Sequence, residues 1–289
     1  MASGIINVNK PLGITSMDVV RSIRKASHIK KVGHGGTLDP LATGVLPVAC
    51  GKATRLLEYI LNDDKHYHAT IELGIRTDTF DREGRIIDER DSSAVTDGDV
   101  HRILSQYCGE IVQFPPKYSA IKVKGKRLYE LARAGAQVDI KPRPVKVYYI
   151  QLIAFEPPLL TVDIKCGKGF YVRSFAEDLG NSLQCGAHLK GLQRTSTGPF
   201  DISGSVELHK VLSSFEKGTE WEVMKEPGAC LEGLEVIKLT LNESTLVSHG
   251  RRIPANVGEV TTKSLERSAA YNDSGEMIAV MKLDKNEKE

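Results

Sequence analysis

The sequence predicts an α+β protein, because strand-like and helix-like patterns are mixed along its 289 residues. Residues 67–73 alternate between two faces as a half-buried strand does, and residues 45–50 form the short apolar run of a fully buried strand. Amphipathic segments with helix-start signals lie among the strands, and the first opens with Thr15-Ser16-Met17-Asp18, a capping-box pattern. A chain of this length holds one large domain, or a large domain and a small one.

The individual elements can be justified in chain order. Val19, Val20 and Ile23 give the first expected helix an apolar face. Pro157-Pro158 separates two strand-like runs and predicts a hairpin between them. We expect strands at 5–8, 45–50, 67–73, 145–155 and 159–166, and helices that begin near residues 15, 54, 97 and 170.

The composition excludes several classes of protein. A hydrophobic share of 40% and a charged share of 26% are those of an ordinary globular protein. We expect neither a signal peptide nor a membrane segment, since no apolar run approaches the ~20 residues that span a bilayer. Five scattered cysteines without a C-x-x-C pair indicate free thiols and no zinc site. Together these features predict a cytoplasmic protein.

The net charge of +2 conceals an uneven distribution along the chain. Residues 201–289 carry 11 Lys and Arg against 16 Asp and Glu, whereas the first 200 residues carry 28 against 21. Within 114–146 there are nine basic and two acidic residues, with Tyr118 and Tyr129 among them. A solvated surface is the common explanation of such a run, but basic and aromatic residues together favour binding to a nucleic acid.

A glycine-rich stretch at residues 33–44 contains a single carboxylate, Asp39, followed by Pro40. Its glycines permit positive φ angles and the close approach of another chain. The stretch is neither a P-loop nor a dinucleotide-binding turn, because its spacing fits neither G-x-x-x-x-G-K-[ST] nor G-x-G-x-x-G. An acid on this loop, next to His34 and a basic run, fits a reactive carboxylate that faces a polyanion. A turn-forming aspartate is the other interpretation.

The stretch 33–44 closely resembles the catalytic motif of the tRNA pseudouridine-55 synthases, the TruB family. The resemblance covers roughly residues 5 to 205, and ordered blocks of this kind are far more specific than one pattern. The further blocks are Asn9-Lys10-Pro11 with Gly13 and Ser16, Tyr67, Leu73 to Thr79 with Asp81 and Gly84, Pro115 to Ala120, Gly169 to Arg173, Cys185 to Leu189, and Leu192-Gln193-Arg194.

The resemblance implies a pseudouridine-synthase fold, in which a central mixed, largely antiparallel sheet is flanked by helices. It implies a catalytic domain over residues 1–232, with residues 114–146 as a thumb that folds over an RNA stem-loop. Residues 233–289 would form a small PUA-like β-barrel that contacts RNA, and their acidic composition is the weakest part of the match. In this last segment we expect strands at 235–241, 246–252 and 277–283.

The resemblance also implies an activity, the conversion of uridine 55 in the T-loop of tRNA to pseudouridine, without a cofactor or a metal. The uridine must be flipped out of the stem-loop at a cost of a few kcal/mol, which stacking on an aromatic ring partly recovers. Asp39 would be the catalytic carboxylate, by attack at C1′, by addition at C6 or by deprotonation of the ribose. Tyr67 would stack on the base and is a candidate for removing the C5 proton. Without the resemblance it would be interpreted as a core tyrosine.

Arg173 lies near the start of a helix, where a cation does not stabilise the helix dipole, and the resemblance favours its pairing with Asp39. Such a pair would lower the pKa of Asp39 by roughly 1–3 units and keep it ionised. Lys10 would support the active-site loop, and Tyr171 and Leu192 would line the uracil pocket. His34 would fill the space that the flipped base leaves, or contact the T-loop. The residues expected to bind RNA are His34, Lys10, Tyr171, Leu192, Lys122, Lys124, Lys126 and Arg127.

Three other functions compete with a stand-alone tRNA isomerase that acts as a monomer without an obligatory protein partner. A guide-RNA-dependent synthase would share the Asp39 motif, but that class lacks the thumb insertion. An RNA-binding or tRNA-folding module would not depend on Asp39. A glycoside or nucleoside hydrolase would need a second catalytic carboxylate facing the first. Asp81, the nearest candidate, fits better as a structural residue or as one that orients Arg173.

Overall fold

The computed structural model describes residues 3–119, 121–123, 125–128, 131, 138–254 and 267–282. The chain divides into two compact units, Met1–Met224 and Lys225–Glu289. The boundary expected from the sequence lies a few residues further along the chain, at 232. Each unit has a sheet of its own, and the glycine-rich stretch belongs to unit 1.

Within its described residues, unit 1 is built on one ten-stranded mixed sheet. The strands run in the order β14-β1-β3-β12-β4-β11-β10-β7, while β13 pairs with β12 and β2 with β3. The β1–β14 and β3–β12 pairs are parallel and the other pairs are antiparallel, so the expected mixed, largely antiparallel sheet is confirmed. Its strands are β1 (Gly4–Lys10), β2 (Val32–His34), β3 (Ala42–Cys50), β4 (Lys65–Leu73), β7 (Gly109–Gln113), β10 (Arg143–Glu156), β11 (Leu159–Cys166), β12 (Ala187–Thr197), β13 (Phe200–Asp201) and β14 (Val206–Glu207).

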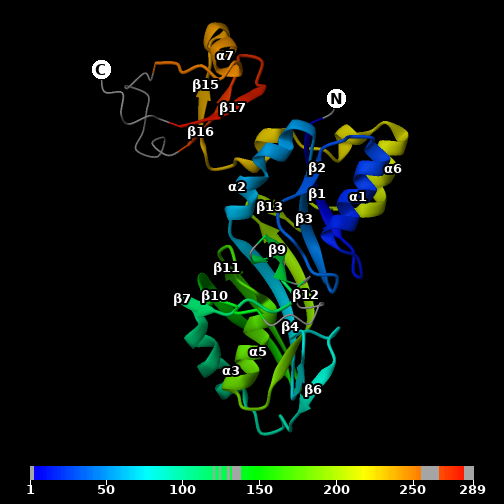
Figure 1. Ribbon diagram of the computed structural model, residues 1–289, viewed down its shortest axis with the longest axis vertical. Coiled ribbons are helices and arrows are strands. Elements are labelled where there is room, and N and C mark those ends of the chain that lie inside the picture. Colours follow the sequence, from blue (N-terminus) through cyan, green and yellow to red (C-terminus); the bar gives the residue numbers. More distant parts are fainter. Residues whose placement is uncertain are drawn as a thin grey trace. The chain divides into compact units, whose positions relative to one another are not determined.

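Helices cover this sheet in two groups (Figure 1). One group, α1 (Ser16–Ser27) and α6 (Leu208–Lys217), packs with β1 and β3. The other group, α3 (Asp97–Leu104) and α5 (Val172–Ser182), packs with β4, β10, β11 and β12. Tyr67 and Leu192 contact both apolar clusters, so they mark the junction at which the candidate site lies. The short helix α2 spans Leu57–Asn62, and 3-10 turns lie at Gly51–Leu56, Ser105–Tyr107, Glu220–Glu222 and Pro227–Cys230.

Local sequence signals explain where these elements begin and which faces they bury. In β4, Ala69, Ile71 and Leu73 are buried, whereas the residues between them are partly exposed. At the start of α1, Thr15 Oγ1 accepts from the N–H of Asp18, and the Asp18 carboxylate accepts from the N–H of Thr15. The expected hairpin around Pro157-Pro158 is confirmed by the antiparallel pairing of β10 with β11.

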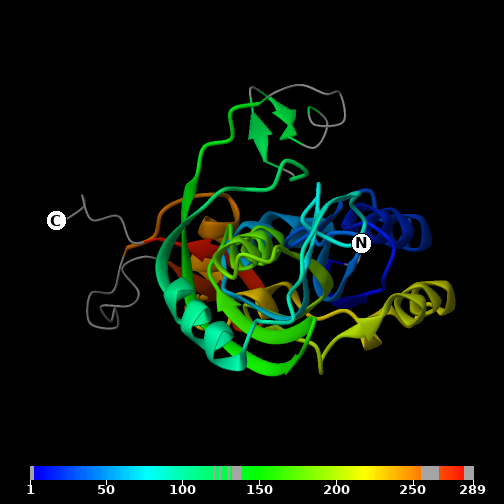
Figure 2. The ribbon, with the colours of Figure 1, turned by 90° about the horizontal axis from the view of Figure 1, so that it is seen from below.

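The segment between β7 and β10 leaves the sheet, as the expected thumb insertion would. It contains the two-residue strands β8 (Lys122–Val123) and β9 (Lys126–Arg127), which pair antiparallel. In Figure 2 this short hairpin lies outside the body of unit 1. A second small ribbon, β5 (Ile75–Thr77) with β6 (Ile86–Glu89), occupies the turn-rich segment after β4.

The described residues of unit 2 form a three-stranded sheet and a helix, and they do not close into the expected barrel. The elements are β15 (Glu235–Lys238), β16 (Ser268–Tyr271), β17 (Met277–Met281) and α7 (Leu241–Ser248). The strand expected at 246–252 is wrong, because α7 extends into it. Thr240 starts this helix with a capping box: its Oγ1 accepts from the N–H of Glu243, whose carboxylate accepts from the N–H of Thr240.

Ile71 is fully buried in β4, inside the core of unit 1. We expect Ile71→Ala to lower the free energy of unfolding by about 2–5 kcal/mol, because it removes apolar contacts and leaves a cavity. Chemical denaturation monitored by circular dichroism measures this change. The control Thr70→Ala, on the partly exposed face of the same strand, should change it by about 0.5 kcal/mol or less. Equal losses in the two variants would contradict the faces assigned to β4.

Candidate active site

Four residues from neighbouring strands form a cross-strand row at the junction of the two helix groups. Lys10 of β1 pairs with Gly44 of β3, Gly44 with Arg194 of β12, and Arg194 with Tyr67 of β4. Residues paired in this way point their side chains to the same face of a sheet, so Lys10, Arg194 and Tyr67 share one face. Gly44 has a φ of +98° and must lack a side chain, because a Cβ there would clash with the carbonyl oxygen of Arg194.

The loop that carries Asp39 is fastened to unit 1 by two side chains from other elements. Ser16, at the start of α1, accepts from the N–H of Leu38 at 2.8 Å and donates to its carbonyl oxygen at 3.1 Å. Arg194 donates from Nη2 to the carbonyl oxygen of Gly36 at 3.1 Å. Asp39 therefore has bonded neighbours on its N-terminal side, one of them tied directly to the cross-strand row.

Lys10 ties down the other side of this loop. Its side chain is completely buried, and its ammonium group donates to the carbonyl oxygens of Pro11 at 2.9 Å, Ile14 at 2.7 Å and Pro40 at 3.5 Å. Burial lowers the pKa of Lys10 to about 8, and the Asp39 carboxylate opposes that change. Because it has no exposed surface, Lys10 is placed to support the loop.

Asp39 and Arg173 form the ion pair that was expected, with Arg173 Nε 2.9 Å from Asp39 Oδ2. Arg173 is buried in the first turn of α5. Its Nη1 lies 3.6 Å from Asp81 Oδ2, and its Nη2 donates to the carbonyl oxygen of Tyr118 at 2.9 Å. Nη1 also donates to the carbonyl oxygen of Thr79 at 3.4 Å, and these contacts fix the direction from which the guanidinium meets Asp39.

The pKa of Asp39 does not follow the expected direction. Burial raises this pKa, and the Arg173 guanidinium opposes the rise, so the lowering expected from the ion pair is wrong. Loss of hydration outweighs the attraction of the cation, and the nearby Asp81 carboxylate adds to the rise. The Asp39 side chain is still 33% exposed, which leaves one edge of the carboxylate accessible to a substrate.

Two tyrosines and a leucine expected around the uracil come from three separate elements. Leu192 of β12 pairs with Ala69 and so lies next to Tyr67 on the same face. Tyr171 precedes α5, where its N–H donates to Gln113 Oε1 at 2.8 Å. Burial raises the pKa of both tyrosines, to about 12 for Tyr67, and the Asp39 carboxylate contributes to both shifts. Asp39, Tyr67 and Tyr171 therefore lie in one neighbourhood.

The remaining candidates for RNA contact lie on other elements. His34 ends β2, in register with Val48 of β3, just before the Asp39 loop. The other candidates belong to the basic segment 114–146. Of Lys122, Lys126 and Arg127 the structure describes the backbone, in the β8–β9 hairpin, and Lys124 lies outside the described residues.

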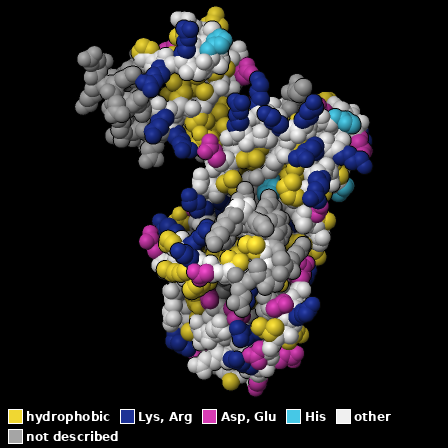
Figure 3. Space-filling model, in the orientation of Figure 1, with side chains coloured by type: hydrophobic (Ala, Val, Ile, Leu, Met, Phe, Trp, Pro, Cys, Tyr) yellow, Lys and Arg dark blue, Asp and Glu magenta, His cyan; other side chains and the backbone are white. Residues whose placement is uncertain are grey.

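Exposed Lys and Arg side chains also gather around α1, where the dark-blue side chains of Figure 3 are dense. They come from α1 itself, from the turn before β2 and from the 3-10 turn before α2. This surface is the electrostatic footprint expected of a protein that binds a phosphate backbone. Its members are Arg21, Arg24, Lys25, Lys30, Lys31, Lys52 and Arg55.

Two groups in this site were not anticipated from the sequence. The carbonyl oxygen of Tyr118 holds Arg173, and the guanidinium of Arg194 holds the Asp39 loop. Both residues belong to blocks that carry the family resemblance. For Arg194 the available signal was a cation within a central strand of the sheet. For Tyr118 no signal exists, because a sequence does not indicate where a backbone carbonyl will point.

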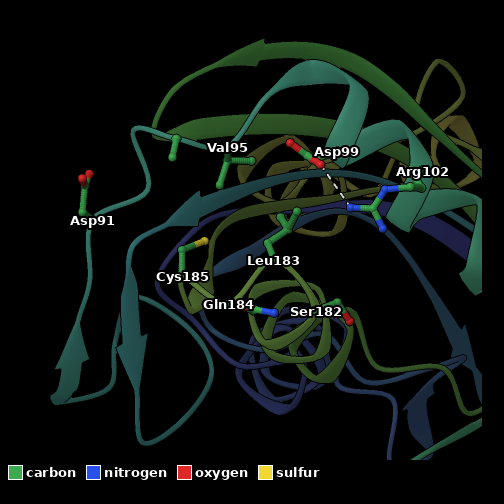
Figure 4. Close-up of a pocket in the computed structure, with 9 residues that line it drawn as sticks. Asp91, Val95, Asp99, Arg102, Ser182, Leu183, Gln184 and Cys185 are labelled. Carbon is green, nitrogen blue, oxygen red and sulfur yellow. Dashed lines mark hydrogen bonds and ion pairs between the residues drawn. The ribbon is translucent and has the colours of Figure 1, made fainter.

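Two cavities lie outside the Asp39–Arg173 pair. The first, of about 280 Å³, lies between α3 and the end of α5, where Leu183 and Cys185 face it and Asp99 pairs with Arg102 (Figure 4). The second, of about 420 Å³, is lined by β4, β10, β11 and β12, and His68 there pairs with Asp163 at 2.7 Å. Neither cavity is lined by Asp39 or Arg173.

Among the residues that the structure describes, no three His, Cys, Asp or Glu side chains come together in a way that could hold a metal ion. No helix there is both long and apolar enough to cross a membrane. The five cysteines are free thiols.

Comparison with known proteins places this site in a family. The N-terminal domain of the TruB family pseudouridylate synthases matches residues 24–172, and the C-terminal domain of tRNA pseudouridylate synthase B matches 173–234. The tRNA pseudouridine synthase B of Dehalococcoides mccartyi (strain 195) is 42% identical over 97% of this chain and 92% of its own. That of Clostridium tetani is 47% identical over 72% of each chain.

Solved structures show the same likeness. A chain in the crystal structure of a Cbf5-Nop10-Gar1 complex matches with a TM-score of 0.74 and 28% identity, over 96% of this chain and 78% of that one. A chain in an H/ACA RNP bound to a substrate RNA that contains 2′-deoxyuridine matches with a TM-score of 0.72 and 26% identity, over 96% and 77%. The two matched segments together span residues 24–234, which include Asp39, Tyr67, Arg173 and Arg194, and the chain therefore belongs to the TruB family of pseudouridylate synthases.

Proposed function

We propose that Asp39 is the carboxylate with which this chain isomerises uridine 55 of tRNA to pseudouridine. The activity is that of the tRNA pseudouridine synthases to whose family the chain belongs. The observation that carries the assignment is the ion pair of Asp39 with the buried Arg173, on a loop fastened to the sheet. A buried but accessible acid with a shifted pKa and a fixed cationic partner is typical of a reactive group.

The reaction needs little more than one such group. It breaks the bond between C1′ and N1 of the uridine, turns the base and joins C1′ to C5. C5 loses a proton and N1 gains one, so the product is an isomer and no electron or group is transferred to another molecule. Because Asp39 Oδ2 pairs with Arg173, we assign the reaction to Oδ1, by attack at C1′, addition at C6 or deprotonation of the ribose.

Arg173, Asp81 and Lys10 act on Asp39 and not on the substrate. Arg173 holds one carboxylate oxygen, and Asp81 orients the guanidinium from its far side. Lys10 keeps the carbonyl oxygen of Pro40 in place directly after the reactive residue. These three groups are all buried, which is what positioning requires and RNA contact does not.

Tyr67, Tyr171 and Leu192 provide the walls that receive the flipped uracil, and His34 contacts the T-loop from which it comes. For Tyr67 we favour stacking over proton removal. With a pKa of about 12 its phenol keeps the proton at neutral pH, and forming the phenolate at pH 7 would cost roughly 7 kcal/mol. Stacking by the same ring contributes about 1–3 kcal/mol to binding of the base.

Two basic surfaces are proposed to bind the tRNA backbone. One is the thumb, with Lys122, Lys124, Lys126 and Arg127, and the other is the cluster of exposed basic side chains around α1. Residues 233–289 are proposed as the PUA-like RNA-contacting domain. In support, unit 2 has its own sheet, and Arg251 and Arg252 are exposed after α7.

The proposed substrate is the T-stem-loop of tRNA, bound by a monomer in the cytoplasm without an obligatory protein partner. The second candidate is a guide-dependent synthase, which the fold of the Cbf5 structures favours. Relatives that are 42–50% identical carry the name tRNA pseudouridine synthase B, and this observation favours the first candidate. Incubating the purified chain with bare tRNA transcript and mapping pseudouridine separates the two, since a guide-dependent enzyme leaves the transcript unmodified.

Asp39→Asn should lower the rate of pseudouridine formation by at least about 1,000-fold, because the amide has no nucleophilic or basic oxygen. The dissociation constant for tRNA should change by less than about threefold, since the phosphate contacts remain. Tritium release from C5-labelled tRNA and filter binding measure the two quantities. Asp97→Asn, an exposed carboxylate on α3, is the control and should leave both unchanged. Undiminished product from the Asp39→Asn variant would refute the assignment.

The activity should be present above the pKa of Asp39 and lost as the pH falls through it. Burial raises that pKa and Arg173 opposes the rise, so the acid limb of kcat/KM should lie above the usual carboxyl pKa of about 4. Arg173→Met should move the limb to higher pH, and Arg173→Lys should move it less, because lysine keeps a positive charge. The exposed Arg102→Met is the control. A limb that moves to lower pH in Arg173→Met would contradict the electrostatics assigned to the pair.

Replacing Tyr67 should separate the contribution of its ring from that of its hydroxyl. We expect Tyr67→Phe to lower kcat by about tenfold, the value of the one hydrogen bond that holds the ring in place, and Tyr67→Leu to lower it by a further factor of about 5–150 through lost stacking. Single-turnover assays on the T-stem-loop measure both variants. Tyr59→Phe, on α2, is the control. Equal rates for the two Tyr67 variants would show that the ring does not stack.

A further inference from the structure

Arg194 is a charged residue among the largest completely buried side chains of the described chain, at 1% exposed. It lies on β12, in the cross-strand row between Gly44 and Tyr67. The group that most offsets the burial of its charge is the Tyr67 hydroxyl and not a carboxylate. Burying a cation in this way costs the free energy of its hydration. The position of Arg194 in the sheet therefore indicates a functional role.

The planar guanidinium of Arg194 spans both sides of the Asp39 loop. Its Nε donates to the carbonyl oxygen of Val45 at 2.7 Å, after the loop, and its Nη2 donates to that of Gly36 at 3.1 Å, before Asp39. Gly36 has a φ of +127°, and a Cβ there would lie 3.2 Å from Nη1, so the backbone approaches the guanidinium closely. A single side chain therefore sets the spacing between the two ends of the loop.

The same guanidinium lies against Tyr67. The two residues are directly opposite each other on β12 and β4, and Arg194 counteracts the rise that burial produces in the pKa of the phenol. A guanidinium has only donors, so the phenol oxygen is the acceptor in this contact. The phenol hydrogen therefore points away from the guanidinium.

We propose that Arg194 is a positioning residue for the isomerisation, which holds the Asp39 loop and the hydroxyl of Tyr67 in one fixed arrangement. Through the carbonyl oxygens of Gly36 and Val45 it places the carboxylate, and through the phenol oxygen it fixes the position of the Tyr67 ring that stacks on the uracil. The carboxylate and the stacking ring then bracket the base at a constant distance. This inference rests on the proposed function.

A double-mutant cycle tests it, with Arg194→Lys, Tyr67→Phe and the variant that carries both changes. Lysine keeps the positive charge, but it lacks the planar guanidinium that reaches the carbonyl oxygens of Gly36 and Val45 and the phenol oxygen of Tyr67 at once. We expect Arg194→Lys to lower the single-turnover rate at least about tenfold, with the dissociation constant for tRNA changed by less than about threefold. In the Tyr67→Phe background the same change should lower the rate by a clearly smaller factor, because the part of its effect that passes through the Tyr67 hydroxyl is gone while the part that passes through the Asp39 loop remains. Arg76→Lys, at an arginine that pairs with Glu177, is the control and should not change the rate.

Each other outcome has a defined meaning. Equal fold losses in both backgrounds, or a rate that Arg194→Lys leaves unchanged, would overturn the proposal. So would a loss confined to tRNA affinity or thermal stability, which a merely structural residue would also produce. If Arg194→Lys does not fold, Arg194→Gln, a smaller neutral donor, goes through the same cycle. Absence of pseudouridine from the wild-type reaction would overturn the proposed function and this inference with it.

Discussion

The ion pair between Asp39 and Arg173 requires neighbouring groups that compensate for the hydration that both charges lose. Two opposite charges removed from water gain mutual attraction but lose hydration, and here the loss prevails at the carboxyl group. The Asp81 carboxylate and the carbonyl oxygens of Thr79 and Tyr118 surround the two terminal nitrogens of the guanidinium. Removing either charge from such a pair typically costs about 3–5 kcal/mol, because the other is left buried. The site is therefore held together by the same charges that make Asp39 reactive.

Backbone carbonyl oxygens accept the hydrogen bonds of the other two buried cations of the site. Lys10 binds the carbonyl oxygens of Pro11 and Ile14, and Arg194 binds those of Gly36 and Val45. Turning these carbonyls inward fixes the course of the chain on both sides of Asp39. A loop rich in glycine would otherwise be conformationally free, so the buried cations give it the rigidity that a reactive group requires.

Much of this arrangement could be predicted from residue patterns, and the failures have physical causes. The alternation in β4, the capping box of α1 and the pairing of Asp39 with Arg173 all follow from local patterns or from the family motif. The direction of the Asp39 pKa shift does not, since burial is contributed by segments far apart in the chain. The strand expected at 246–252 is wrong because the capping box at Thr240 starts a helix there, in a segment whose apolar pattern is too weak to distinguish a helix from a strand. The burial of Lys10 could not be predicted either, because its hydrogen-bond partners are backbone carbonyl groups, which every residue carries.

The root of the thumb is tied to α5 at consecutive positions. Arg173 holds the carbonyl oxygen of Tyr118, and the next residue, Ser174, donates from Oγ to that of Phe114 at 2.7 Å. The chain that leads to the β8–β9 hairpin is thus bonded, at the carbonyl oxygen of Tyr118, to the same guanidinium that pairs with Asp39. The place where that chain leaves unit 1 and the position of the Asp39 carboxylate therefore depend on one shared side chain, that of Arg173.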